Sequence, residues 1–393
     1  MIAKLFAVLS ADGVETRAVG GAVRDAILGL RVTEIDLATT APPQKVMDLA
    51  REAGLKAIPT GIEHGTVTVI ADGVPFEVTT LRRDIETFGR HAKVAFTKNW
   101  EEDARRRDFT LNALYADREG TVFDPLGGYA DLMTGRVRFI GKAEDRIKED
   151  YLRILRFFRF NAYYGKGALD ADGLKASVKL REGLSQLSAE RVAAEIRRLL
   201  VAPQAMRGLA ALYDYGLLTD ILGGVPRLVR LDRLIAIDQA YGLTPDAALR
   251  LAALAVFVSE DAERLAARLH LSNAEQAVLE LAAGETVKPE DEVSAKEILY
   301  RLGADTFRAR LLLAWAESGA DPHDSHWRSL FTLPERWPAP NFPLRGADLV
   351  ELGEAKGPEI GELLRRLEAE WIADGFSGSR EALIIRAKEL STK

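Results

Sequence analysis

The stretch Val19-Gly20-Gly21-Ala22-Val23-Arg24-Asp25, followed by Thr33-Glu34-Ile35-Asp36-Leu37-Ala38-Thr39, decides the fold. Residues 16–19 have the composition of a strand, and residues 22–30 that of a helix. A glycine pair at such a turn lets backbone N–H groups approach a phosphate, and the start of a helix favours negative charge. Arg24 could reach phosphate oxygens. The alternative is a tight turn with an Arg–Asp surface pair.

Two carboxylates follow on the next segment, at Glu34 and Asp36. In an extended chain they share one face, about 6–7 Å apart, which suits two carboxylates that share a divalent cation. Hard oxygen ligands favour Mg²⁺, and Glu77 in the strand-like segment 75–80 is a third acid that could join them across a sheet. A lone Glu-x-Asp also fits a solvated strand, but its place after the glycine turn favours a site.

The composition is that of an ordinary globular protein. The chain has 393 residues, 47% of them hydrophobic and 28% charged, which suggests two to four compact units. No window approaches the ~18 apolar residues of a membrane span, and no cleavage-site pattern follows the apolar residues 1–10. The absence of cysteine excludes disulfides, iron–sulfur clusters and a thiol nucleophile. We expect a cytoplasmic protein with no membrane partner.

Charge is unevenly distributed along the chain. The net charge of −6 argues against a general nucleic-acid binder. Residues 136–160, however, carry eight basic and four acidic side chains. A local basic stripe of this kind favours contact with phosphates.

The secondary-structure pattern changes near residue 140. Before it, strand-like and helical runs alternate, and the turns at residues 71–73 and 117–120 predict antiparallel hairpins. After it, only helical periodicity is visible, including one helix over 143–160. We therefore predict an α+β fold with an N-terminal mixed-sheet head and a long helical extension. The fingerprints of dinucleotide-binding folds and P-loops are absent.

The ordered motifs resemble a known family, the class II tRNA nucleotidyltransferases and bacterial poly(A) polymerases. The resemblance begins with the glycine turn and the paired acids quoted above. It continues through His64-Gly65-Thr66, Glu77–Thr80, Arg106–Ala113, Asp124–Gly128 and Glu149–Phe160, with a weaker match at Leu344–Leu349. It implies a nucleotidyltransferase catalytic head (1–140), a helical neck (141–225), and a helical body and tail that bind tRNA (226–393).

The resemblance also implies a reaction and its residues. A tRNA 3′-hydroxyl attacks the α-phosphate of CTP or ATP, and pyrophosphate leaves. Glu34 and Asp36 would hold Mg²⁺ (or Mn²⁺), with Glu77 as a third catalytic acid. Gly20, Gly21 and Arg24 would lie near the triphosphate, and Arg107 beside the nucleotide. tRNA, CTP and ATP are the expected partners, and no protein partner is implied.

Base recognition is assigned to the segment around residue 150. Asp150 and Arg153 are three residues apart, and on a helix they would be neighbours on one face. The carboxylate accepts and the guanidinium donates hydrogen bonds, so a rigid pair could read the Watson–Crick edge of C or A and exclude G and U. Arg156 and Arg159 would serve the triphosphate.

One position departs from the family. Members usually have aspartate where this chain has Glu34, which leaves three outcomes: a tolerated ligand, a slow enzyme or an inactive variant. We favour retained activity because the other motifs are intact. Residues 58–66 and the full-length segment 81–97, which we expect as a loop, favour complete CCA addition. The alternatives are an A-adding or CC-adding enzyme, a poly(A) polymerase, or a catalytically weak RNA-binding homologue.

Overall fold

The computed structural model describes residues 2–88, 91–284, 289–351 and 358–391. The chain forms two compact units: Met1–Pro226 with Leu265–Leu271, and Arg227–Arg264 with Ser272–Lys393. In the described part of the chain, no helix is both long enough and apolar enough to cross a membrane. The predicted division at residues 140 and 225 remains a prediction.

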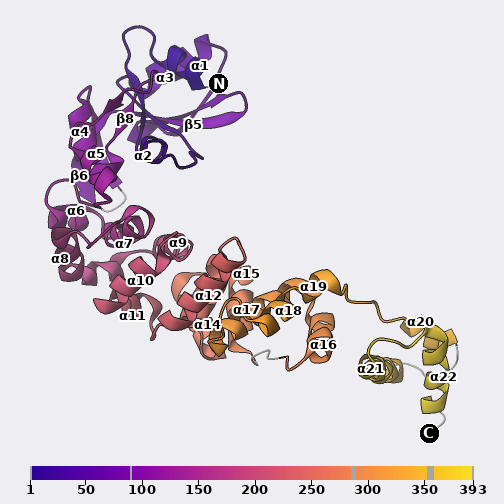
Figure 1. The fold of residues 1–393 in the computed structure, drawn as a ribbon. Helices are drawn as coiled ribbons and strands as arrows, with labels where there is room; N and C mark the ends of the chain where they lie inside the picture. The colour runs from indigo at the N-terminus through magenta and orange to yellow at the C-terminus, as the bar shows by residue number, and fades with distance from the viewer. Residues whose placement is uncertain (1, 89–90, 285–288, 352–357, 392–393) are drawn as a thin grey trace. The chain divides into compact units, whose positions relative to one another are not determined.

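A seven-stranded mixed sheet organises the N-terminal part of the first unit (Figure 1). Its strand order is β3-β4-β5-β2-β1-β8-β9. The strands are β1 (Thr16–Val19), β2 (Asp36–Thr39), β3 (Lys56–Gly61), β4 (Thr66–Ala71), β5 (Val74–Thr80), β8 (Tyr115–Ala116) and β9 (Val122–Phe123). Only β2 and β5 pair in parallel. Both predicted hairpins are confirmed, since β4 pairs with β5 and β8 with β9 antiparallel.

Helices cover one face of the sheet, where strands such as β4 place every second side chain in the core. Helices α1 (Ile2–Leu9) and α3 (Pro43–Glu52) share one apolar core with strands β2, β4 and β5. A second core joins Val19, Ala38 and Tyr115 to Ala104 of α4 (Trp100–Arg105). These two cores fix the ends of β1 and β2, where the glycine turn and Asp36 lie.

The expected loop at 81–97 contains two strands. β6 (Arg82–Phe88) and β7 (His91–Phe96) form a separate antiparallel ribbon. Residues 89 and 90, between the two strands, lie outside the described residues.

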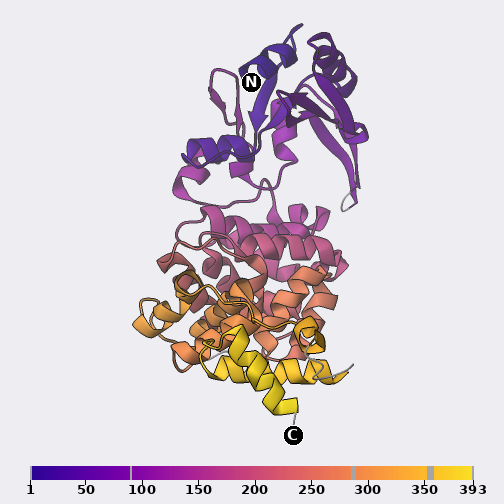
Figure 2. The same cartoon turned by 90° about the vertical axis from the view of Figure 1, so that its right-hand side faces the viewer.

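Beyond β9 the described chain is helical, which confirms the α+β class (Figure 2). The first unit continues with α5 (Gly128–Thr134), α6 (Ala143–Glu149), α7 (Leu152–Tyr164), α8 (Ala171–Lys179), α9 (Ala189–Leu200), α10 (Ala205–Asp214) and α11 (Leu217–Leu222). Later helices are α12 (Leu228–Ala240), α13 (Ala247–Ala255), α14 (Ser259–Leu269), α15 (Asn273–Ala283), α16 (Glu292–Leu302), α17 (Ala304–Ser318), α18 (Ser325–Phe331), α19 (Leu333–Arg336), α20 (Gly346–Glu351), α21 (Pro358–Ala373) and α22 (Arg380–Ser391). Short 3₁₀ turns are η1 (Ile62–His64), η2 (Thr110–Asn112) and η3 (Arg181–Gln186).

The single helix predicted over 143–160 is wrong, because the chain breaks between α6 and α7. Asp150 has an extended backbone (φ −157°, ψ 107°), so the nucleotide-recognition helix does not contain it. Its carboxylate accepts a hydrogen bond from the N–H of Leu152 at 3.1 Å and forms an ion pair with Arg191 at 2.7 Å. These contacts satisfy a free N–H at the start of α7 and hold the side chain away from a helical position.

An aromatic cluster fixes α7 against the head. The ring of Phe157 is fully buried and stacks on Phe139 at a centroid distance of 5.6 Å, with Phe109 at 6.4 Å. A Cβ built on Gly173 of α8 would lie 2.7 Å from the same ring. The packing therefore leaves room only for glycine at position 173.

We expect Phe157→Ala to lower the free energy of unfolding by about 3–5 kcal/mol, because it removes a buried ring and leaves a cavity. Urea denaturation followed by circular dichroism measures the change. Tyr213→Ala on α10 is the control, since its side chain is exposed and should cost less than about 1 kcal/mol. Equal losses in the two variants would contradict the proposed role of the cluster.

Candidate active site

A cavity of about 630 Å³ in the first unit collects most of the predicted site residues. Its lining contains Gly20, Gly21, Arg24, Glu34, Asp36, Arg106, Arg107, Asp108, Asn112, Asp150, Leu152, Arg153, Arg156, Arg159, Phe160 and Arg191. Glu77 is the one predicted residue outside this lining; it borders a smaller neighbouring hollow with His64 and Thr66. The described residues thus join ten of the eleven predicted positions in one concave surface.

The sheet places the glycine turn next to the central carboxylate. Val19 pairs with Asp36 across β1 and β2, so the turn begins beside that aspartate. Gly20 has φ 70° and ψ −121°, a conformation that side chains rarely adopt, and its N–H donates to the carbonyl of Leu114 at 3.0 Å. A Cβ on Gly20 would lie 3.6 Å from a guanidinium nitrogen of Arg107. That distance is an ordinary contact, so it is the backbone conformation that favours glycine at this position.

Three carboxylates create a negative region around Asp36. Glu77 precedes Val78, which pairs with Leu37 on the parallel strand β2, so the sheet register brings the two acids close. The pKa of Asp36 is raised because the surrounding protein partly desolvates it and because Glu77 and Glu34 are negatively charged; Arg107 opposes the shift. Asp36 nevertheless keeps an exposed surface that a ligand can reach.

Glu34 differs from its predicted setting. We expected both acids on one strand, but β2 begins at Asp36 and Glu34 lies in the irregular segment before it. Both side chains still line the same cavity. The described residues contain no group of three or more His, Cys, Asp or Glu side chains that could hold a metal ion alone. Two hard carboxylates in a negative, accessible region do fit a divalent cation that takes its other ligands from phosphate and water.

Asp103 is the buried anchor of two cavity arginines. Its carboxylate accepts Nε of Arg106 at 2.8 Å, Nη2 of Arg107 at 3.1 Å and the hydroxyl of Tyr115 at 2.8 Å. Burial would raise the pKa of Asp103, but the two guanidinium groups and the hydroxyl lower it overall. Arg107 is therefore held in place beside Gly20, as its predicted role requires.

Asp108 and Glu195 hold the arginines of α7 in the same way. Asp108 accepts Nε and Nη2 of Arg156 at 2.8 and 2.6 Å, and it also accepts the amide of Asn112 at 3.1 Å. Although burial opposes the charged form, Arg156 and these hydrogen bonds lower the pKa of Asp108 to about 2. Glu195 of α9 accepts Nε of Arg159 and is 3% exposed, so this pair is also desolvated.

Asp150 and Arg153 line the cavity and share a backbone hydrogen bond, but among the described residues their side chains have different ion-pair partners. Asp150 is bound by Arg191, whereas Arg153 donates to the carbonyl of Arg146 at 2.7 Å and pairs with Glu149. Each of the two proposed base-reading groups is thus fixed by a different neighbour.

Arg24 is buried below the turn. Its guanidinium donates to Asn112 at 2.6 Å and to Asp25 at 2.8 Å, and it lies over the ring of Tyr164 at 4.1 Å. Tyr164 in turn donates to Asp25 at 3.1 Å. These contacts pre-organise the arginine at the cavity wall.

Sequence reasoning missed the residues that hold the arginines. No individual role is assigned from the sequence to Asp103, Asp108, Glu149, Arg191 or Glu195. Asp103 and Glu149 lie three or four residues along the chain from their arginines, a spacing that could have indicated the pairs. Arg191 and Glu195 act across helices, and no local spacing reveals them.

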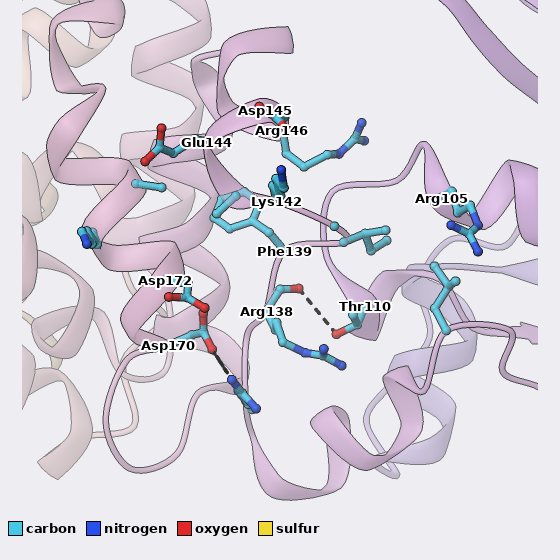
Figure 3. Close-up of a pocket in the computed structure, with 17 residues that line it drawn as sticks. Arg105, Thr110, Arg138, Phe139, Lys142, Glu144, Asp145, Arg146, Asp170 and Asp172 are labelled. Atoms are coloured by element: carbon cyan, nitrogen blue, oxygen red, sulfur yellow. Dashed lines mark hydrogen bonds and ion pairs between the residues drawn. The ribbon is translucent and has the colours of Figure 1, made fainter.

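A larger cavity of about 1080 Å³ in the same unit is a weaker candidate (Figure 3). Its basic side chains are mostly paired: Arg136 with Asp170, Arg138 with Asp131 and Arg105 with Glu101. The remaining exposed lysines, Lys142 and Lys175, are matched by the exposed aspartates Asp145 and Asp172. Most of the positive charge of this cavity is therefore already neutralised by nearby acids, which makes it the weaker candidate for a phosphate ligand.

Comparisons with known proteins decide the family. Residues 16–138 match the model of the poly A polymerase head domain, and residues 168–228 match that of a probable RNA and SrmB-binding site of polymerase A. The mitochondrial CCA tRNA nucleotidyltransferase 1 of Mus musculus is 34% identical over 95% of this chain and 87% of its own length. The chain belongs to the family of CCA-adding tRNA nucleotidyltransferases.

Other members and a solved structure agree. The CCA-adding enzyme of Geobacillus stearothermophilus is 33% identical over 93% of this chain and 90% of its own length. The crystal structure of the Bacillus stearothermophilus CCA-adding enzyme in complex with CTP superposes with a TM-score of 0.80 at 29% identity, covering 100% of this chain and 97% of that one. The chain is thus a nucleotidyltransferase with the fold of this family.

The Asp103 anchor is testable by charge removal. We expect Asp103→Asn to raise KM for both CTP and ATP about tenfold, because Arg106 and Arg107 lose their common partner. Unfolding should become easier by about 3–5 kcal/mol, since two guanidinium groups lose a buried counter-charge. Steady-state kinetics and urea denaturation measure the two effects.

The matched control is Glu101→Gln on the same helix, which removes the exposed pair with Arg105. It should change stability by less than about 1 kcal/mol and leave KM unaltered. An Asp103→Asn variant with the kinetics of this control would contradict the anchoring role.

The low pKa of Asp108 predicts a contribution to acid stability. A carboxyl titrating at about 2 in the folded chain and at about 3.9 when unfolded stabilises the fold fully above pH 4. This contribution, about 2 kcal/mol, is lost as the pH falls from 4 to 2. The difference in unfolding free energy between the natural chain and Asp108→Asn should therefore be larger at pH 7 than at pH 2. A difference that does not vary with pH would exclude the effect.

Proposed function

We propose that the cavity around Asp36 adds C, C and A to the 3′ ends of tRNA from CTP and ATP. The observation that carries this proposal is that the paired acids share one cavity with an anchored acceptor, Asp150, and an anchored donor, Arg153. The family membership supports the same activity, and related structures were solved with CTP, ATP and tRNA.

The reaction needs charge control at the triphosphate. The tRNA 3′ oxygen forms a bond to the α-phosphorus and loses its proton, while the bond from that phosphorus to the bridging oxygen breaks and releases pyrophosphate. Negative charge increases on the leaving oxygens. We assign Arg107, Arg156 and Arg159 to the phosphates, because buried acids hold their guanidinium groups at the cavity wall.

Glu34 and Asp36 are the proposed ligands of Mg²⁺, with Mn²⁺ as a substitute, and Glu77 is the proposed third acid. A bound divalent cation would neutralise phosphate charge and make the attacking hydroxyl more acidic. The raised pKa of Asp36 supports this assignment, since a cation relieves the repulsion from Glu77 and Glu34. Glu34 lies in an irregular segment, where the backbone can accommodate a side chain one methylene longer.

The bases are distinguished by the order of hydrogen-bond donors and acceptors on their Watson–Crick edges. Cytosine and adenine each present an amino donor next to a ring-nitrogen acceptor, whereas uracil and guanine present a carbonyl acceptor next to an N–H donor. Asp150 can accept from the amino group, and Arg153 can donate to the ring nitrogen. A site built this way leaves buried polar groups unpaired with the wrong base, which is the strongest basis for rejection.

Cytoplasm is our proposed compartment. Bacterial relatives are compatible with it, whereas the three vertebrate relatives are mitochondrial by name.

Nucleotide incorporation tests the activity. tRNA transcripts ending before CCA, before CA and before A receive CTP, ATP, GTP or UTP, singly and in pairs, with Mg²⁺ and then Mn²⁺. Addition of C, C and A followed by a stop is expected on a single-nucleotide gel. A alone on transcripts ending in CC would indicate an A-adding enzyme, CC alone a CC-adding enzyme, and long A tails a poly(A) polymerase. If no nucleotide is incorporated but tRNA still binds, the result would indicate a catalytically weak RNA-binding homologue.

The carboxylate assignment predicts a graded series. Asp36→Asn should lower kcat about 1000-fold and Glu34→Gln about 100-fold, because each removes a proposed ligand charge. Glu34→Asp should stay within about tenfold of the natural chain if the longer side chain is a tolerated ligand. Asp48→Asn, on the exposed surface of α3, is the control with unchanged kcat. Equal activity of Asp36→Asn and this control would refute the assignment.

A further inference from the structure

We propose that Arg191 determines base specificity as a positioning residue, by holding the carboxylate of Asp150 in the orientation that accepts from C and A. This inference rests on the proposed function, in which Asp150 reads the base. Neither the family resemblance nor the motifs of the sequence assigned a role to Arg191, which lies in the first turn of α9.

The geometry fixes both oxygens of Asp150. Oδ2 accepts Nη2 of Arg191 at 2.7 Å, and Oδ1 accepts the backbone N–H of Leu152 at 3.1 Å. A carboxylate oxygen has two acceptor positions, so each oxygen retains one for a substrate amino group. The carboxylate is therefore held in one orientation without losing its capacity to bind a base.

The contact with Arg191 is needed because other arginine side chains line the same cavity and also attract the carboxylate of Asp150. The charge of Asp150 already contributes to the raised pKa of Arg156, so the two side chains interact electrostatically. Arg153 follows three residues after Asp150 and lines the same cavity. Without Arg191, the carboxylate would be attracted to these arginines and would leave the position that meets the base.

Besides Arg191, the backbone N–H of Leu152 supports this carboxylate, and it holds Oδ1 rather than Oδ2. Asp150 lies between α6 and α7 in an extended conformation, so helical hydrogen bonds do not fix its side chain. Glu149, its neighbour in the sequence, is paired with Arg146 and Arg153. Arg191 comes from a different helix and contacts Asp150 from 41 residues away. Arg191 also lines the cavity, so the double variant described below tests whether its effect on the base passes through Asp150.

A purely structural role predicts a different result. The same ion pair links α9 to the junction of α6 and α7, so its loss could weaken the fold and slow all nucleotides equally. A positioning role instead changes the ratio between right and wrong nucleotides. The ratio therefore distinguishes the two roles.

The test measures kcat/KM in the full-length chain for CTP against UTP on tRNA lacking CCA, and for ATP against GTP on tRNA ending in CC. Arg191→Met should lower both ratios about 10- to 100-fold, because a carboxylate that is no longer held in one orientation discriminates less between the right and the wrong nucleotide. Arg191→Lys keeps a charged donor and should restore most of the discrimination. Lys179→Met, which removes an exposed pair with Glu144, is the control with unchanged ratios.

Two more variants complete the design: Asp150→Ala alone, and Asp150→Ala combined with Arg191→Met. If Arg191 acts through Asp150, adding Arg191→Met to Asp150→Ala lowers the ratios no further. Equal loss of right and wrong nucleotides in Arg191→Met would overturn the proposal, as would additive loss in the double variant. Unchanged ratios in Asp150→Ala would instead refute the base-reading role in the proposed function. Should Arg191→Met fail to fold in a thermal melt, Arg191→Gln, which keeps the polarity but not the charge, is measured against Arg191→Lys.

Discussion

Mutual repulsion among arginines is the constraint on which the site depends. Seven arginines line one cavity of about 630 Å³. Like charges that line one cavity repel each other, and this repulsion is costly unless counter-charges lie close by. Buried or half-buried acids supply these counter-charges, with Asp108 in the cavity lining and Asp103, Glu149 and Glu195 outside it. Each acid neutralises a guanidinium and fixes its direction, while the cavity face remains available to phosphate.

This arrangement explains why the site needs helices of the first unit as well as the sheet. The sheet supplies the glycine turn and Asp36, and its β1–β2 register sets them side by side. The acids that hold the arginines come from α4, α6, α9 and the segment before η2. An isolated sheet could bind a cation, but it could not hold a row of arginines. The helices of the first unit are therefore part of the chemistry as well as of the fold.

The sequence predicts the parts of this site that depend on local patterns. The glycine turn, the hairpins and the helical extension follow from turn chemistry and periodicity, and all are found. Three local predictions failed: Glu34 lies outside the strand, Asp150 interrupts the helix expected over 143–160, and the expected loop at 81–97 contains two strands. The segment Glu149-Asp150-Tyr151-Leu152 has neither proline nor glycine, and its one local signal is Asp150, whose carboxylate caps the N–H of Leu152 at the start of α7. The second contact of Asp150, with Arg191, spans 41 residues and leaves no trace in helical periodicity.

Recognition without a nucleic-acid template places an unusual demand on electrostatics. A template strand presents its donors and acceptors on rigid rings, whereas a carboxylate and a guanidinium are flexible and attract each other. If Asp150 and Arg153 paired directly, each would satisfy the other and the base would have to break an ion pair to bind. In this structure each is paired outward instead, with Arg191 and with Glu149. Outward pairing keeps the two groups separate at the cavity wall, so in the proposed function specificity depends on the partners of Asp150 and Arg153 as well as on these two residues.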